Sequence, residues 1–146
     1  MQRKPKEIPL VEITLRKFEK PYEKELTVLL KKFCISLGLL QPGDSRDVIV
    51  YILEFLLKKR KERKLVTVDE IRDYLKEKKL RGLTPQNLRR HLKKLEDIYL
   101  VDRVGNGVRI KEWMELPELI KEIEEYLVIP IFNRIEEYAR RIEDSI

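Results

Sequence analysis

Hydrophobic residues recur with helical spacing in the stretch 83–95, LTPQNLRRHLKKL. Three leucines at i, i+4 and i+7 give this stretch one apolar face: Leu88, Leu92 and Leu95. Thr84 is a suitable N-cap, because its hydroxyl can accept a hydrogen bond from a free backbone N–H at the helix entrance. Pro85 follows at the first helical position, where its missing N–H costs nothing. The pattern predicts a helix over residues 85–96.

The other positions of this predicted helix are polar or basic, and they point away from the apolar face. Glutamine can pair with adenine and arginine with guanine in a DNA major groove, and both can bind phosphates. On this basis the candidate DNA-binding residues of the segment are Thr84, Gln86, Asn87, Arg89, Arg90, Lys93 and Lys94. Taken alone, the same pattern suits a solvated amphipathic helix equally well, since charge runs usually face water.

Apolar periodicity also predicts helices earlier in the chain, at residues 21–37, 46–60 and 68–78. Asp44 or Ser45 is expected to cap the second of these. Thr67 and Glu70 form a capping box for the third, because each side chain can satisfy a free N–H near the other. The turn at residues 81–83 contains a glycine and joins the third helix to the basic one.

Four short runs have the composition of β-strands. Residues 8–15 partly alternate and predict a strand, and Leu65–Val66 predicts a short edge strand. Residues 99–104 and 108–111 flank Gly105-Asn106-Gly107, and this predicts a hairpin, because Gly and Asn tolerate positive φ. The candidate DNA contacts near the hairpin tip are Arg103, Asn106 and Arg109.

The last 31 residues predict one or two helices, beginning at Leu116-Pro117 and kinked by Pro130. Residues 127–132 are almost entirely apolar, and a helix that is apolar on every side must be covered on several faces. A second copy of the chain is the expected cover, with folding back onto the same chain as the alternative. The expected dimer interface consists of Leu127, Ile131, Phe132, Ile135, Tyr138 and Ile142.

Charge is distributed unevenly along the 146 residues, whose net charge is +6. Residues 111–146 carry −5, which leaves +11 on residues 1–110. The window 76–94 alone carries +7, with Glu77 as its one acidic residue. A basic block joined to an acidic tail indicates a polyanionic partner at one end of the chain and a different contact at the other.

The residues required for most catalytic and metal sites are missing from the sequence. The chain has one histidine, His91, and one cysteine, Cys34, so a clustered His/Cys metal site is not expected and no cofactor is predicted. No glycine-rich phosphate loop or nucleophile elbow occurs, which argues against an enzyme.

No apolar run approaches the length of a membrane span, and the single cysteine suits a reduced, cytoplasmic protein. Abundant Lys, Arg and Glu with few Gln and Asn is typical of thermophilic proteins.

The predicted elements of residues 44–111 resemble a winged-helix DNA-binding domain. Their order is helix, short strand, a helix opened by TVDE, the basic helix LTPQNLRRHLKKL and the hairpin YLVDRVGNGVRI. The resemblance implies a mainly α fold with a small β-hairpin wing, flanked here by N- and C-terminal helices. It also implies that the basic helix enters the major groove and that the wing contacts DNA backbone or minor groove.

The sequence therefore predicts an N-terminal packing or dimerisation segment (1–43), a winged helix-turn-helix (44–111) and a C-terminal helical dimerisation segment (112–146). The expected function is sequence-specific binding of double-stranded DNA by a homodimeric transcriptional regulator of archaeal type. The alternative is a protein-interaction module in a transcription or replication assembly, because winged helices also serve as docking modules. The sequence does not show whether a small-molecule effector binds.

Overall fold

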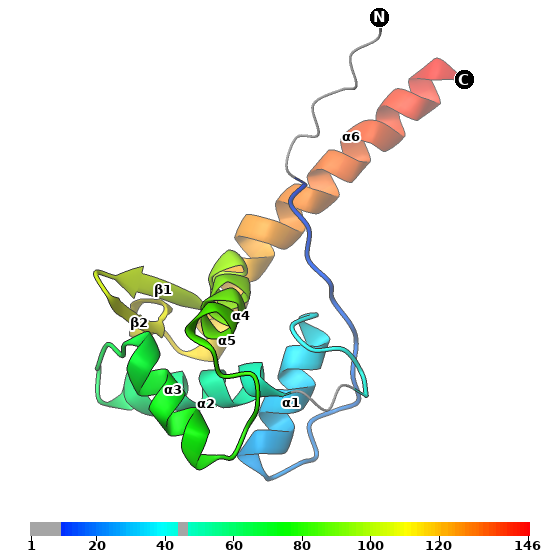
Figure 1. Cartoon of the computed structure of the whole chain (residues 1–146). Coiled ribbons are helices and arrows are strands. Elements are labelled where there is room, and N and C mark those ends of the chain that lie inside the picture. The colour runs from blue at the N-terminus through cyan, green and yellow to red at the C-terminus, as the bar shows by residue number, and fades with distance from the viewer. Residues whose placement is uncertain (1–9, 44–46) are drawn as a thin grey trace, which may run out of the picture.

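The computed structural model describes residues 10–43 and 47–146 (Figure 1). Its α-helices are α1 (Leu26–Ser36), α2 (Val48–Lys61), α3 (Val68–Glu77), α4 (Pro85–Asp97), α5 (Leu116–Ile123) and α6 (Ile129–Ser145). Its strands are β1 (Val101–Val104) and β2 (Gly107–Ile110), and a short 3₁₀ turn (Lys111–Trp113) follows β2. The predicted mainly helical fold with one small antiparallel hairpin is confirmed.

Helix α2 forms the centre of the hydrophobic core. Its residues 48–50 and 52–56 are buried, because α1, α3 and β2 all pack against it. Glu54 is the one buried charged residue among those described, and Tyr74 of α3 donates a hydrogen bond to it at 2.5 Å. Burial raises the pKa of Glu54, but the Tyr74 hydroxyl and the charge of Lys58 outweigh burial and lower it. The Glu54–Tyr74 contact therefore fixes α3 against α2 at little electrostatic cost.

The hairpin is joined to the residues before α3 by a further pair of backbone hydrogen bonds. Val66 N–H donates to Val108 O at 3.0 Å, and Val108 N–H donates to Val66 O at 2.7 Å. Val66 thus lies on the outer side of β2, and the predicted edge pairing is confirmed at Val66 alone, as an isolated bridge and not as a strand over Leu65–Val66. Because Val66 immediately precedes α3, this pairing sets the start of α3 next to the hairpin.

Helices α3 and α4 begin where their capping residues predict. Thr67 Oγ1 accepts a hydrogen bond from Glu70 N–H, and Thr84 Oγ1 accepts one from Asn87 N–H, each at 3.2 Å. Gly82 has φ +74° in the turn between the helices, a conformation that glycine adopts without strain. The two helices pack against each other and are held to α2 and the hairpin by their buried faces.

Near the N-terminus, two predictions are wrong. Residues 10–15 form no strand, and Leu10 is 88% exposed, because no sheet edge lies there to pair with them; residues 8 and 9 lie outside the described part. The backbone is tethered instead by Arg16, whose N–H donates to Ser36 O and whose guanidinium donates to Ile35 O at 2.8 Å. Helix α1 begins at Leu26 rather than at Pro21.

Two further element starts differ from prediction or lie outside the described residues. Asp44 and Ser45, the expected caps of α2, are not among the described residues, and Asp47 is the observed N-cap. Strand β1 begins at Val101 rather than Tyr99, because Tyr99 has φ +65° in the turn that ends α4. That left-handed residue reverses the chain, so that Leu100 and Val101 return to the core.

Of the two predicted alternatives for the C-terminal segment, one helix or two, the structure has one nearly continuous helix, with an irregular turn just before Pro130. A π-helical turn at Glu124–Val128 joins α5 to α6, and Ile129 N–H donates to Glu124 O. The wider turn accommodates the proline, and Val128 and Ile129 keep helical φ and ψ. Helix α6 then extends away from the other helices and contains no buried residue (Figure 1). In the described residues, no helix combines the length and apolar character needed to cross a membrane.

Candidate nucleic-acid interface

Helix α4 is held in one rotational setting by its leucines. Leu88, Leu92 and Leu95 are each fully buried. Since residues between these positions must lie on the opposite face of the helix, the polar and basic side chains are exposed to solvent. The exposed set comprises Gln86, Arg89, Arg90, Lys93 and Lys94. The structure therefore brings together on one surface the basic side chains predicted from this helix.

Asn87 is half-buried and engaged at the start of α4. Its amide Nδ2 donates to Gly82 O at 3.4 Å, and its Oδ1 accepts from Arg90 Nη2 at 2.8 Å. Asn87 thus links the glycine turn to an arginine on the exposed face. Thr84 likewise uses its hydroxyl to cap the helix. These two predicted contact residues are better placed to position α4 and Arg90 than to reach a ligand themselves.

The basic side chains of α4 differ in whether they form ion pairs within the chain. Lys93 Nζ lies 2.9 Å from Asp97 Oδ1, one turn along the helix. Arg89 and Lys94 make no ion pair with any residue that the structure describes. Arg89 and Lys94 therefore offer unneutralised positive charge, whereas Lys93 has to exchange a carboxylate for any new anionic partner.

A shallow cleft of about 370 Å³ separates the start of α3 and α4 from the hairpin tip. Its lining consists of Thr67–Asp69, Arg89, Arg103 and Gly105–Val108. Two of the predicted wing residues, Arg103 and Asn106, thus face the same cleft as Arg89 from α4. Asp69 is its one acidic lining residue. The cleft joins the exposed face of α4 to the hairpin as one continuous surface.

Both hairpin arginines are paired within the chain. Arg103 Nε lies 3.1 Å from Glu96 Oε2 and ties the hairpin to the end of α4. Arg109 makes two hydrogen bonds to Asp102, at 2.7 and 3.1 Å, and its guanidinium lies 5.0 Å from the Trp113 ring centroid. The hydrogen bond to Asp102 raises the pKa of Arg109. Arg109 lies mid-strand, opposite Asp102 in the register, and not at the exposed tip.

His91 lies on the flank of α4 and is partly buried. Its Nδ1 is buried without a hydrogen-bond partner in the described part of the chain. Burial lowers the pKa of His91, and the neighbouring charges of Lys94 and Arg90 lower it further. The histidine is therefore neutral near pH 7, as a side chain between two cations should be.

The predicted dimer-interface residues divide into a buried one and an exposed stripe. Leu127 is buried in the core of its own chain, together with Leu119 and Ile123 of α5. Ile131 is half-buried at the start of α6. Phe132, Ile135, Tyr138 and Ile142 are between 57% and 68% exposed. The uncovered part of the predicted interface therefore lies from Ile131 onward and does not include Leu127.

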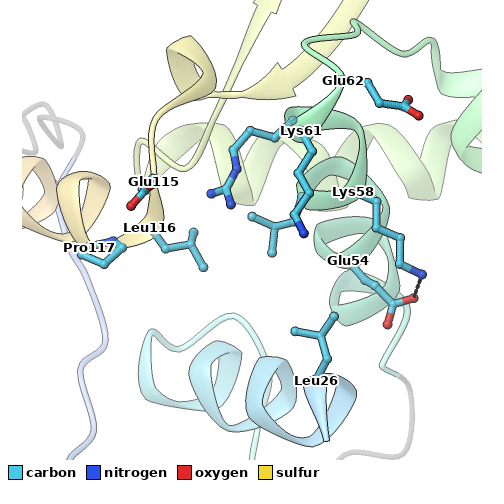
Figure 2. A pocket seen from close by; sticks show the side chains of 10 residues that line it. Leu26, Glu54, Lys58, Lys61, Glu62, Glu115, Leu116 and Pro117 are labelled. Carbon is cyan, nitrogen blue, oxygen red and sulfur yellow. Dashed lines mark ion pairs between the residues drawn. The ribbon is translucent and has the colours of Figure 1, made fainter.

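A second cleft lies between α1, α2 and the start of α5, and has a volume of about 670 Å³ (Figure 2). Leu26, Leu57 and Leu116 form its apolar part. Figure 2 shows charged side chains around it, and the lining includes three cations (Lys58, Arg60, Lys61) and three carboxylates (Glu54, Glu62, Glu115). Because these charges balance, the cleft has no electrostatic preference that defines a ligand.

Within residues 10–43 and 47–146, no cluster of His, Cys, Asp or Glu side chains could hold a metal ion. Cys34 is fully buried, and burial raises the pKa of its thiol to about 12, as expected for a core cysteine. Comparisons with protein-family models, curated proteins and solved structures gave no match to this chain. Function is therefore inferred from the surface formed by α4 and the hairpin.

Proposed function

We propose that the chain is a winged-helix protein that binds double-stranded DNA sequence-specifically and acts as a homodimeric transcriptional regulator. In this proposal α4 enters the major groove, and the β1–β2 hairpin is the wing that lies along the sugar–phosphate backbone. The order of α2, Val66, α3, α4 and the hairpin supports it, as does the antiparallel pairing of Val66 with Val108.

The main support for the proposal is the orientation of α4 about its own axis. Full burial of its three leucines leaves Gln86, Arg89 and Arg90 exposed within the first two turns, the part of a recognition helix that reaches deepest into the groove. Arg89 also lines the cleft at the hairpin tip, so a DNA backbone lying there could contact the helix and the wing together. The charge of +11 on residues 1–110 adds a sequence-independent attraction to phosphate.

The proposed role of each side chain in DNA binding follows from its position and from its partners within the chain. Arg89 and Arg90 are the proposed base readers, with Gln86 beside them. Lys94 and Asn106 are proposed backbone contacts, because Lys94 makes no ion pair with the described residues and Asn106 is exposed at the hairpin tip. Lys93, Arg103 and Arg109 contribute only when phosphate replaces the carboxylates that now hold them.

The second candidate is a protein-docking module with the same fold. The pairing of Arg103 with Glu96 and of Arg109 with Asp102 favours it, because both pairs reduce the positive charge that the hairpin presents to a polyanion. Asp69 in the cleft acts in the same direction.

Gel-shift titrations with mixed genomic duplexes at several salt concentrations separate these two functions. A DNA-binding surface predicts a linear fall of log affinity with log salt, and Lys94→Ala should lower that slope by about one unit. Lys121→Ala, an exposed cation on α5, is the matched control and should leave the slope unchanged. Absence of binding at low salt would contradict the DNA-binding proposal and leave the docking module.

A further inference from the structure

Helix α6 presents a continuous apolar stripe that its own chain does not cover. Its side chains follow helical spacing: Ile131, Phe132, Ile135, Tyr138, Ala139 and Ile142. Each large residue of the stripe beyond Ile131 is more than half exposed. Single exposed hydrophobic residues are ordinary, but a contiguous stripe of this kind marks an interaction surface.

The stripe continues a row that is buried earlier in the same helix. Leu119, Ile123 and Leu127 stand at i+4 steps and are buried in the core. Ile131 and Ile135 extend the row, but here α6 has already left the domain (Figure 1). The start of α6 is therefore anchored in the core through α5, so the stripe is presented on a preformed helix.

The two edges of the stripe carry opposite charges. At about 100° per residue, Arg134 and Arg141 lie on one edge of the stripe and Glu136 and Glu143 lie on the other. Each edge is about a quarter-turn from the centre of the stripe. One residue of each edge is already paired along the helix, Arg134 with Glu137 and Glu136 with Arg140, whereas Arg141 and Glu143 make no ion pair with the described residues. Both edges can therefore accept a partner of opposite charge.

The edge charges select the orientation of a second copy. When two identical helices face each other in parallel, the arginine edge of each lies beside the glutamate edge of the other. When they face each other in antiparallel orientation, arginine meets arginine and glutamate meets glutamate. Like charges across an interface oppose association, whereas complementary edges favour it and fix the alignment.

We propose that α6 is the site of self-association and pairs in parallel and in register with α6 of a second copy. Phe132 and Tyr138 supply the aromatic side chains common at interface centres. The parallel arrangement places both folded domains at the same end of the helix pair, as two half-sites of one duplex require. The role of this parallel pair in DNA binding rests on the proposed function. The pairing itself can be measured without DNA.

Cysteine cross-linking tests the orientation. Ile135→Cys and Ile142→Cys, made separately in the full chain, should both give covalent dimers under mild oxidation, because identical seam positions face each other in a parallel pair. Asn133→Cys, on the opposite face of α6, should not cross-link, and neither should the unaltered chain, whose Cys34 is fully buried.

Antiparallel pairing gives a different result. Residues 135 and 142 lie about 10 Å apart along the helix, so an antiparallel pair can bring only one of them opposite its own copy. A dimer by light scattering that cross-links at one position or at neither would overturn the parallel arrangement. A chain that stays monomeric at micromolar concentration would overturn self-association through α6. Gel shifts report separately on DNA binding, so its failure is distinguishable from both results.

Charge reversal provides a second test. Arg134→Glu with Arg141→Glu should weaken the dimer by about tenfold, because it converts complementary edges into repelling ones. Adding Glu136→Arg and Glu143→Arg restores complementary edges and should restore the affinity. An antiparallel pair already has like charges facing each other, so an unchanged affinity in the first variant would contradict the proposal.

Discussion

Lys111 Nζ lies 2.6 Å from Glu122 Oε2 and joins the end of the hairpin to α5. The ammonium also lies 5.2 Å from the Tyr99 ring centroid and 5.8 Å from that of Tyr126. Both side chains of the ion pair are about four-fifths buried, and the hydrogen bond to Glu122 raises the pKa of Lys111. This cluster fixes α5 relative to the hairpin, and thereby fixes the direction in which α6 leaves the domain.

Glu122→Gln should therefore lower the free energy of unfolding by about 1 kcal/mol, a value between those of exposed and buried charged hydrogen bonds. Urea denaturation measures this loss. Glu125→Gln, at an exposed position on the same helical segment, is the control and should be nearly neutral. Equal stabilities for the two variants would show that Lys111 and Glu122 do not anchor α5.

Gly107 has a packing role that differs from the one predicted for it. Only Gly105 has positive φ at the hairpin tip, and a Cβ added there would meet open space. A Cβ at Gly107 would lie 2.7 Å from Leu65 Cβ. Gly107→Ala should thus destabilise the fold by about 1–3 kcal/mol through overpacking. Gly105→Asn should change stability by less than about 0.5 kcal/mol, because Asn tolerates positive φ. A thermal melt that ranks the two variants in the opposite order would contradict this assignment.

His91 makes stability depend on pH in the mildly acidic range. Its pKa is lowered in the folded chain, first by burial and then by Lys94 and Arg90, from an ordinary value of 6.5. The unfolded chain therefore binds this proton more readily, and the free energy of unfolding should fall as pH drops below 6.5. Carboxylates titrate mainly below this range, so His91→Gln should remove most of the fall between about pH 7 and pH 5.5. Urea titrations across the range test it, and an unchanged pH profile in the variant would exclude His91 as the cause.

The boundary between the folded domain and the pairing segment lies near Val128. A chain ending at Glu115 would lose Leu119, Ile123 and Leu127 from the core, and losing each such buried side chain costs about 2–5 kcal/mol. Residues 1–128 should therefore remain folded and be monomeric, whereas residues 1–115 should be destabilised or unfolded. Circular dichroism and light scattering distinguish these outcomes. A dimeric 1–128 chain would place the subunit interface outside α6.

Much of α4 and its surroundings was predictable from local sequence. Thr84, Pro85 and the leucine spacing define the helix, and the Thr67–Glu70 cap defines its predecessor, because capping and periodicity act within a few residues. The Asp102–Arg109 pair was not predicted, because the expected three-residue tip at residues 105–107 sets Val104 opposite Val108, whereas the observed two-residue loop sets Val104 opposite Gly107 and Asp102 opposite Arg109.

The other features depend on contacts distant in sequence. The burial of Leu127, the approach of Gly107 to Leu65 and the Lys111–Glu122 pair all arise from packing between separate elements. The strand expected at residues 8–15 failed for a related reason. Local β-propensity forms a strand only where another strand is available for pairing.

Selection of bound sequences from a random duplex pool, followed by affinity measurements with variants of α4, tests most directly whether this helix reads DNA. We expect the unaltered chain to enrich a two-part motif with inverted symmetry. Arg89→Ala or Arg90→Ala should cost about 1–3 kcal/mol at that motif and relax the preference at one base position, while Lys121→Ala leaves both unchanged. Failure to enrich any motif, or full retention of affinity and preference by both arginine variants, would contradict α4 as the recognition helix.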